Sequence, residues 1–221
     1  MNPINKILVA GVLPLLALLT GQRAFAFDGF LRPSGWYVDY NNPDYKSKTG
    51  AAVAVGATLG VTQAHELAVE VAQVSWAVQR PFGLIVPGGF LGVTGSGRLT
   101  PVLANYRCYL GRPEARVRFY GGGSLGEAKV AGDIAFLQSG FSYGGHTDTW
   151  RTMFGGTAGV AISLTPAVRL DVGYRYLQWS DSAVATRFFV GAGGFTGAAA
   201  STLHFGETKA NIAALGLTLR F

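Results

Sequence analysis

The stretch that decides the fold is Asn211-Ile-Ala-Ala-Leu-Gly-Leu-Thr-Leu-Arg-Phe221. Large apolar residues alternate in it with small or polar ones: Leu215, Leu217, Leu219 and Phe221 against Ala214, Gly216, Thr218 and Arg220. A β-strand points successive side chains to opposite faces, so a period of two indicates a strand whose faces meet different surroundings. We therefore predict an amphipathic strand over residues 211–221.

The same alternation recurs upstream and predicts eight strands in all. The other seven segments are residues 36–40, 51–61, 67–71, 102–110, 117–123, 154–164 and 168–176. Short connections are predicted at 62–65, 111–115 and 165–166, and longer, Gly-, Ser-, Thr- and Asp-rich ones at 41–50, 79–97, 130–149 and 180–207. Short turns at one rim and long loops at the other are typical of membrane barrels, and an even number of antiparallel strands can close without an edge. The predicted fold class is all-β: an eight-stranded antiparallel up-and-down transmembrane β-barrel.

The first 26 residues have the features of a secretory signal peptide. Lys6 precedes an apolar run from Ile7 to Leu19, and Ala24 and Ala26 form a small-x-small cleavage site. The run is about 13 residues long, shorter than the ~20 that a spanning helix needs. We predict cleavage after Ala26, which divides the chain into a signal peptide, residues 1–26, and a barrel domain, residues 27–221.

The composition narrows the function classes. Charged residues make up 14% of the chain, against about 25% in soluble domains. The formal net charge of +6 falls to +4 without the signal peptide, which holds two of the 18 Lys and Arg residues and none of the 12 acidic residues. This moderate charge, spread along the chain, argues against a nucleic-acid partner. Cys108 is the single cysteine, and we interpret it as a small apolar filler on a strand.

Charged residues gather on the face opposite the large apolar ones, and we predict that they fill the lumen of the barrel. The predicted lumen charge network comprises Asp39, Glu70, Arg107, Arg118, Asp171 and Arg175, with Glu66, Arg116 and Arg169 nearer the turns. An eight-stranded barrel is just wide enough for its own side chains, so these groups must pair across it or stay desolvated at a large cost. An alternative interpretation is a narrow, gated conductance in which Arg residues exchange partners.

Aromatic residues near the strand ends predict the two membrane interfaces, where such side chains form girdles. Those assigned to the outward face are Trp36, Tyr40, Tyr106, Trp150, Tyr174, Tyr176 and Phe221. The last connection carries the apolar stretch Phe188-Phe-Val-Gly-Ala-Gly-Gly-Phe195. Three interpretations stay open for this stretch: a patch that binds a partner, a continuation of the flanking strands, or a segment folded over the barrel mouth.

Three sequence patterns could indicate a nucleotide-binding, metal-binding or catalytic site, but each lacks a feature that such a site needs. Gly121-x-Gly123-x-x-Gly126 matches a dinucleotide fingerprint, but no helical period follows it, as that site requires. The histidines at 65, 146 and 204 lack the close spacing of a metal motif. The only local grouping of Ser, His and acidic residues is Ser142, His146 and Asp148. We therefore expect no cofactor, no metal and no enzymatic activity, with a lipid A-modifying enzyme as the least favoured alternative.

Over essentially its whole length, the chain resembles the OmpA-like and opacity-type eight-stranded outer-membrane proteins. The most specific part is Gly216-x-x-Leu219-x-Phe221, which is similar to the signal read by the barrel-assembly machinery, although Ala214 stands where a polar residue is usual. Similar stretches are Thr100-Pro-Val-Leu-Ala-Asn-Tyr-Arg107, Arg118-Phe-Tyr-Gly-Gly-Gly123 and Leu170-Asp-Val-Gly-Tyr-Arg-Tyr176.

The resemblance implies a location and a role. It implies a monomer in the outer membrane of a Gram-negative cell, in contact with lipids and lipopolysaccharide and inserted by the barrel-assembly machinery. The implied role is structural or in surface interaction, with long loops that meet a ligand. The alternative is a small gated pore of the OmpW kind for small solutes.

Overall fold

The computed structural model describes residues 27–41, 45–60, 62–86, 89–138, 141–179, 183–192, 195–204 and 208–221, all of them in strands or in the connections between strands. The predicted signal peptide, with Ala24 and Ala26, lies outside these residues. The strands are β1 (Phe27–Tyr40), β2 (Lys48–Leu59), β3 (His65–Val86), β4 (Gly89–Leu110), β5 (Val117–Gln138), β6 (Phe141–Ser163), β7 (Val168–Trp179), β8 (Ala183–Ala192), β9 (Phe195–His204) and β10 (Thr208–Arg220). Within the described residues, no helix is long and apolar enough to cross a membrane.

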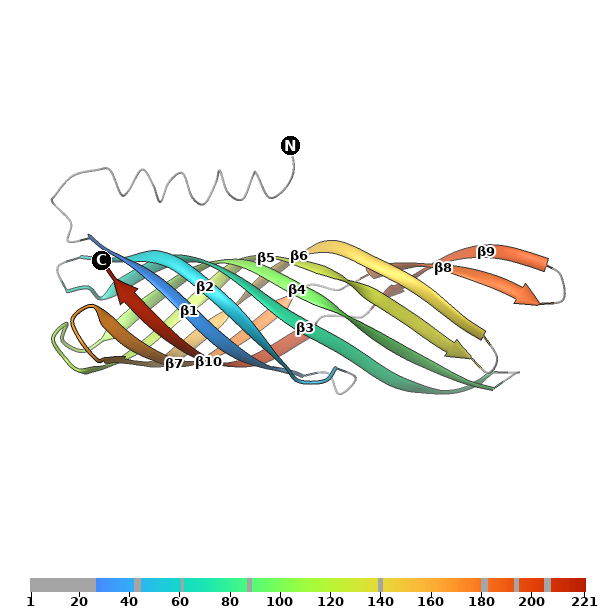
Figure 1. Cartoon of the computed structure of the whole chain (residues 1–221), viewed down its shortest axis with the longest axis horizontal. Helices are drawn as coiled ribbons and strands as arrows, with labels where there is room; N and C mark the ends of the chain where they lie inside the picture. Colours follow the sequence, from blue (N-terminus) through green and yellow to red (C-terminus); the bar gives the residue numbers. More distant parts are fainter. Residues whose placement is uncertain are drawn as a thin grey trace, which may run out of the picture.

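Eight of these strands form a closed antiparallel barrel, in the order β1-β10-β7-β6-β5-β4-β3-β2 (Figure 1). The barrel closes where β1 pairs with β10, from Phe30 opposite Arg220 to Tyr40 opposite Ala210. The predicted fold class is therefore confirmed. The short connections β2–β3, β4–β5 and β6–β7 share one end of the barrel with the start of β1 and the end of β10, and we call it the turn end.

Strands β3 to β6 continue far beyond the other four strands at the opposite end (Figure 1). β3, β4 and β5 have 22 residues and β6 has 23, whereas β2 and β7 have 12. The sequence prediction of long loops at 79–97 and 130–149 is therefore wrong, because most of these residues pair as strands. Their many glycines lower strand propensity, but backbone pairing between β4 and β5 runs unbroken from Leu110 to Gly92. We call residues 75–86, 89–98, 131–138 and 141–152 the projecting sheet.

The last long connection also contains strands. β8 and β9 pair with each other, from Ala183 opposite His204 to Ala192 opposite Phe195, in a sheet separate from the barrel. This hairpin lies beyond the end of the barrel on the side of the projecting sheet (Figure 1). Of the three interpretations of the stretch from Phe188 to Phe195, the strand interpretation comes nearest, although the hairpin forms its own sheet instead of extending the barrel strands.

The outer wall of the barrel is a belt of exposed apolar side chains. It includes Leu31, Tyr37, Val53, Val55, Leu67, Val71, Tyr106, Leu110, Val117, Phe119, Leu125, Phe154, Val172, Tyr174, Leu215, Leu217, Leu219 and Phe221, from all eight barrel strands and the ends next to them. The alternation in residues 211–221 thus places Leu215 and its apolar neighbours on this belt. Soluble monomers rarely expose a continuous apolar surface of this extent.

Strand β1 faces the opposite way from its prediction. Trp36 and Tyr40 are buried in the barrel interior and do not belong to an outer girdle. Asp39 is exposed on the outer face, where it accepts a 2.7 Å hydrogen bond from the Ser47 hydroxyl, so its assignment to the lumen is wrong. Apolar residues were assigned outward on the assumption of a polar lumen, and that assumption fails where the interior is itself apolar.

Two adjacent glycines in β5 differ in the space that surrounds them. A Cβ atom on Gly122 would collide with the Tyr106 carbonyl oxygen, whereas a Cβ atom on Gly121 would meet nothing within 4 Å. Gly122 therefore permits a close approach of β4 and β5 that any side chain would block. The Gly121-x-Gly123-x-x-Gly126 pattern lies within this strand, with no helix after it, which excludes the nucleotide-binding loop it mimics.

Candidate functional site

The lumen of the barrel has two layers of different chemistry. Nearer the turn end lies a charged layer, formed by Arg32, Glu66, Glu70, Asn105, Arg107, Tyr109, Arg118, Tyr120, Arg169, Asp171, Arg175 and Thr218. Above it lies an apolar plug, formed by Trp36, Val38, Tyr40, Val74, Trp76, Val78, Leu99, Leu103, Met153, Leu177, Trp179 and Ile212 with smaller alanines. The sequence predicted the first layer and missed the second.

Glu66 is the centre of the charged layer. Its carboxylate accepts hydrogen bonds from Arg32 at 2.7 Å, Arg169 at 2.9 Å and the Tyr109 hydroxyl at 2.7 Å. The Arg107 guanidinium lies 3.7 Å from the same carboxylate. Strands β1, β4 and β7 are therefore joined to β3 through one buried side chain, which is 1% exposed.

A second group surrounds Asp171 and includes two of the same arginines. Arg107 and Arg169 each have a guanidinium nitrogen 3.4 Å from the Asp171 carboxylate, and the Thr218 hydroxyl donates to it. Glu70 forms a separate pair with Arg175 at 2.7 Å and also accepts from the Asn105 amide at 2.9 Å. The predicted residues Glu70, Arg107, Arg118, Asp171 and Arg175 thus all lie in the buried lumen.

Besides Asp39, one charged residue was missed and another was misplaced. Arg32 was not predicted, because Pro33 and Gly35 disfavour a strand in this segment, yet it lies in β1 and pairs with Glu66. Arg116 was predicted to point inward, but it is exposed in the turn before β5. A turn residue has no fixed inward or outward parity, so alternation could not place it.

Several of these guanidinium groups form cation–π contacts with aromatic rings. The Arg107 guanidinium lies 4.5 Å from the centre of the Tyr120 ring, and Arg175 lies 5.0 Å from that of Trp36. Such contacts are favourable, most strongly where both groups are desolvated. Because Trp36 belongs to the plug, its contact with Arg175 joins the two layers.

The apolar plug closes the upper lumen. Leu103 and Met153 are 0% exposed, so protein atoms fill the space around them. Tyr45, from the β1–β2 connection, packs over the plug with its ring 5.4 Å from Tyr40 and 6.4 Å from Trp76. A cluster packed this closely keeps water away from its own side chains.

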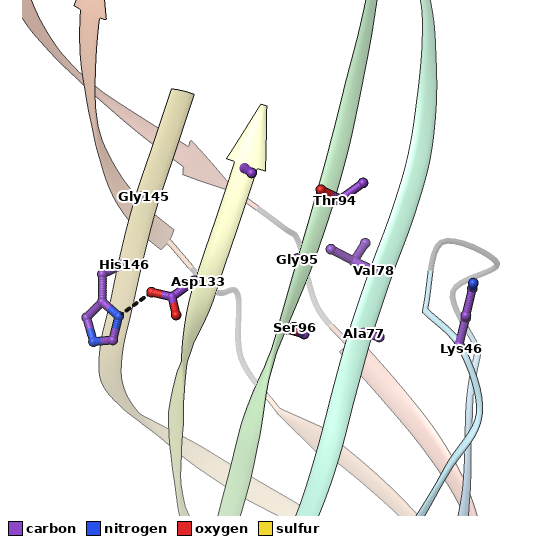
Figure 2. Close-up of a pocket in the computed structure, with 10 residues that line it drawn as sticks. Lys46, Ala77, Val78, Thr94, Gly95, Ser96, Asp133, Gly145 and His146 are labelled. Carbon is purple, nitrogen blue, oxygen red and sulfur yellow. Dashed lines mark hydrogen bonds and ion pairs between the residues drawn. The ribbon is translucent and has the colours of Figure 1, made fainter. Parts of the chain in front are cut away.

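The outer face of the projecting sheet carries a row of small and polar side chains, which we call the polar row. Cross-strand pairing aligns Ala77, Ser96, Asp133 and His146 on β3 to β6, and the backbone N–H of Lys46 donates to the Ala77 carbonyl at one end. These residues line an open hollow of about 810 Å³ (Figure 2). His146 Nδ1 is 2.8 Å from the Asp133 carboxylate, and both side chains are exposed.

The grouping of Ser142, His146 and Asp148 does not form a catalytic triad. All three are on β6, where Ser142 and His146 are four positions apart, which puts their Cα atoms about 13 Å from each other. His146 pairs with Asp133, and Asp148 with the Lys129 ammonium at 3.2 Å. Among the described residues, no cluster of three or more His, Cys, Asp or Glu could hold a metal ion.

Comparisons with known proteins agree with this architecture. No family model matches the sequence, and no curated protein matches it either. Among solved structures, a major outer membrane protein from Thermus thermophilus is 9% identical, with 87% of this chain and 99% of that chain covered and a TM-score of 0.53. Ail, the attachment invasion locus protein of Yersinia pestis, is 17% identical, with 88% and 97% covered and a TM-score of 0.43. Neisserial surface protein A is 14% identical, with 90% and 100% covered and a TM-score of 0.40.

At these identities the similarity concerns the fold alone. The similarity that we use is that to the Thermus protein, whose TM-score is 0.53. Together with the closed eight-stranded barrel, it shows that the chain has the fold of the eight-stranded outer-membrane barrels that its sequence resembles.

Proposed function

We propose that this chain is an outer-membrane scaffold protein, not an enzyme or an open pore, and that it presents its projecting sheet outside the cell. The observation that carries the proposal is the contrast between two outer surfaces of the same strands. On β5, Leu125 belongs to the apolar belt, whereas Asp133 lies on the polar row of the projecting sheet. An apolar belt is stable in hydrocarbon, and the polar surface above it is stable in water.

The orientation follows from the connections. Outer-membrane barrels have short turns on the periplasmic side and longer extracellular segments. The turn end therefore faces the periplasm, and the projecting sheet and the β8–β9 hairpin face the exterior. A rigid wall that holds exposed segments at a fixed height is the usual arrangement for binding by loops.

Lipopolysaccharide is the proposed lipid partner at the outer interface. Arg98 and Lys129 lie on the outer face beyond the belt, towards the projecting sheet, and we place the lipid phosphates at their level. Phosphate groups attract Lys and Arg side chains at this depth. Within the belt the wall closes without an unpaired strand edge, which supports a monomer in the membrane.

The packing of the lumen favours a scaffold over a small gated pore of the OmpW kind. The charged layer alone could exchange ion-pair partners, but the apolar plug above it is continuous from Trp36 to Trp179. Opening a water path would require this cluster to separate, at the cost of exposing large aromatic side chains.

The orientation is tested by labelling intact cells with a membrane-impermeant maleimide. In a Cys108→Ser background, Ser96→Cys places a thiol on the projecting sheet, and Ala167→Cys places one in the β6–β7 turn. We expect Ser96→Cys to react in intact cells and Ala167→Cys to react only after lysis. The reverse pattern would overturn the proposed orientation, and gel mobility before and after boiling verifies that both variants are folded.

A further inference from the structure

The charged layer contains more positive than negative side chains. Its buried arginines are Arg32, Arg107, Arg118, Arg169 and Arg175, and its buried carboxylates are Glu66, Glu70 and Asp171. Five guanidinium groups thus face three carboxylates, an excess of two positive charges in the lumen. A buried charge without a counter-charge is strongly destabilising, so this excess calls for a compensating anion.

Arg118 is the arginine of the charged layer that lacks an ion-pair partner among the described residues. Its side chain is 3% exposed. One guanidinium nitrogen donates to the Gln63 carbonyl oxygen at 3.2 Å, and the group lies 4.9 Å from the centre of the Tyr109 ring. Its Nε and Nη2 atoms are buried without a hydrogen-bond partner.

Two other arginines lie close to the same point. Arg169 also lies over the Tyr109 ring, at 4.7 Å, and its Nη1 atom is buried without a partner. Arg220 donates to the side-chain oxygen of Gln63 at 3.2 Å. Three guanidinium groups, from β5, β7 and β10, therefore gather around Gln63 and Tyr109 at the turn end.

A hollow at the turn end borders this cluster at Gln63 and Arg220, and Arg118 and Arg169 lie buried behind these two residues. The hollow is open, has a volume of about 690 Å³ and is lined by Gln63, Arg220, Arg116, Asp28, Glu114 and residues of the β6–β7 turn. Asp28 accepts a hydrogen bond from the Gln63 amide and so helps to hold this side chain in the mouth. Gln63 itself adopts a positive φ of 47°, an uncommon conformation for a residue with a side chain.

We propose that the turn-end mouth of the lumen binds a small oxyanion of the phosphate or sulfate class, held by Arg118 with Arg169 and Arg220. The planar fork of a guanidinium matches two oxygens of such an anion. The free Nε and Nη2 atoms of Arg118 are the pair of donors that forms such a fork. The bound anion supplies the missing negative charge and joins three strands at the point where the barrel wall ends.

The test uses the folded barrel in maltoside micelles, which contain no lipid phosphate. Thermal unfolding is followed by tryptophan fluorescence while sodium phosphate is titrated against sodium chloride at constant ionic strength. For the wild type we expect a saturable rise of the unfolding midpoint on the order of 3 °C. Arg118→Gln should lose the rise, and Arg118→Lys should keep only part of it. Arg112→Gln is the matched control, because Arg112 is exposed in the β4–β5 turn and does not line the hollow, and it should respond like the wild type.

Either of two results would overturn the proposal: a wild-type midpoint that phosphate does not change, or a rise of equal size in Arg118→Gln. If Arg118→Gln does not fold, ³¹P NMR of phosphate with the wild type decides. The phosphate line should broaden saturably with folded protein and not with boiled protein, and an unchanged line width overturns the site. Repeating the titration in phosphocholine micelles shows whether a lipid headgroup competes for it. None of these results depends on which side of the membrane the projecting sheet faces.

Discussion

The Arg32 guanidinium on β1 lies 2.7 Å from the Glu66 carboxylate on β3, and both side chains are almost completely buried. β1 and β3 are not neighbours in the barrel, since β2 separates them. The ion pair therefore reaches past β2 inside the lumen and does not merely reinforce a pair of neighbouring strands. Because Glu66 also accepts from Arg169 and Tyr109, it connects opposite sides of the wall.

Replacing Glu66 by Gln should destabilise the barrel strongly. The substitution removes the charge that Arg32 and Arg169 share, leaving Arg32 without its ion-pair partner and Arg169 with Asp171 alone. Breaking a buried ion pair from one side typically costs about 3–5 kcal/mol. Urea unfolding of the refolded barrel in lipid vesicles, followed by tryptophan fluorescence, measures the free-energy change.

The matched control is Asp133→Asn, which removes a carboxylate from an exposed pair with His146. Exposed pairs contribute little, so a change below about 0.5 kcal/mol is expected. Equal effects of the two substitutions would contradict the central role of Glu66.

Adjacent glycines of β5 provide a second test. Gly122→Ala forces a methyl group against the Tyr106 carbonyl oxygen, and only a shift of β4 from β5 can relieve the contact. Overpacking of this kind costs about 1–3 kcal/mol. Gly121→Ala changes the same residue type one position away, where the methyl group points into open space. Comparing the unfolding free energies of the two variants isolates the close approach, and a loss of the same size in both would refute it.

The lipid-facing belt predicts a position-dependent cost of charge. Leu125 is 62% exposed on the outer face of β5, and Leu125→Arg should lower stability in vesicles by about 2–4 kcal/mol if it lies near the bilayer midplane. Ser96→Arg is the control, because Ser96 is on the outer face of the projecting sheet. It should change stability by less than about 0.5 kcal/mol. A projecting sheet that lay in lipid would instead make Ser96→Arg as costly as Leu125→Arg.

The two layers of the lumen predict the conductance. In planar bilayers, the wild type should show no steady conductance, because the apolar plug seals the upper half. Arg107→Ala alone should not create a pore, since the plug stays intact, whereas Arg107→Ala combined with Trp76→Ala should open a water path through both layers. Steady wild-type conductance that disappears when Arg107 is replaced would favour the gated pore instead.

The comparison of sequence with structure separates what alternation can determine from what it cannot. Alternation located all eight barrel strands, because lipid on one side and a packed lumen on the other impose a period of two. It assigned the two faces of β1 the wrong way round, because Trp36 and Tyr40 are as stable in an apolar lumen as they would be in lipid.

Alternation could not predict which charged side chains pair across the lumen either. Glu66 and Arg169 are 103 residues apart, and only the register of intervening strands brings them together. The projecting sheet was missed because Gly-rich segments have low strand propensity, and their pairing with each other compensates for it. The excess of arginine could be counted from the sequence. That Arg118 has no ion-pair partner could not, because it depends on which carboxylates pair with the neighbouring arginines.

Phe221 yields the last prediction, which concerns assembly in the cell. Its backbone N–H donates to the Gly29 carbonyl at 3.0 Å, next to the seam where β1 meets β10, and its side chain is 82% exposed. A ring so exposed adds little packing to the folded barrel, so Phe221→Ala should scarcely change the unfolding free energy of protein refolded in detergent. If Gly216, Leu219 and Phe221 form the signal read by the assembly machinery, the same substitution should reduce the amount of folded protein in the outer membrane severalfold. Phe119→Ala, another exposed aromatic on the belt, should leave that amount unchanged. A parallel loss of stability in vitro and of yield in cells would assign Phe221 a structural role in place of a signalling one, because a recognition signal acts before the barrel closes.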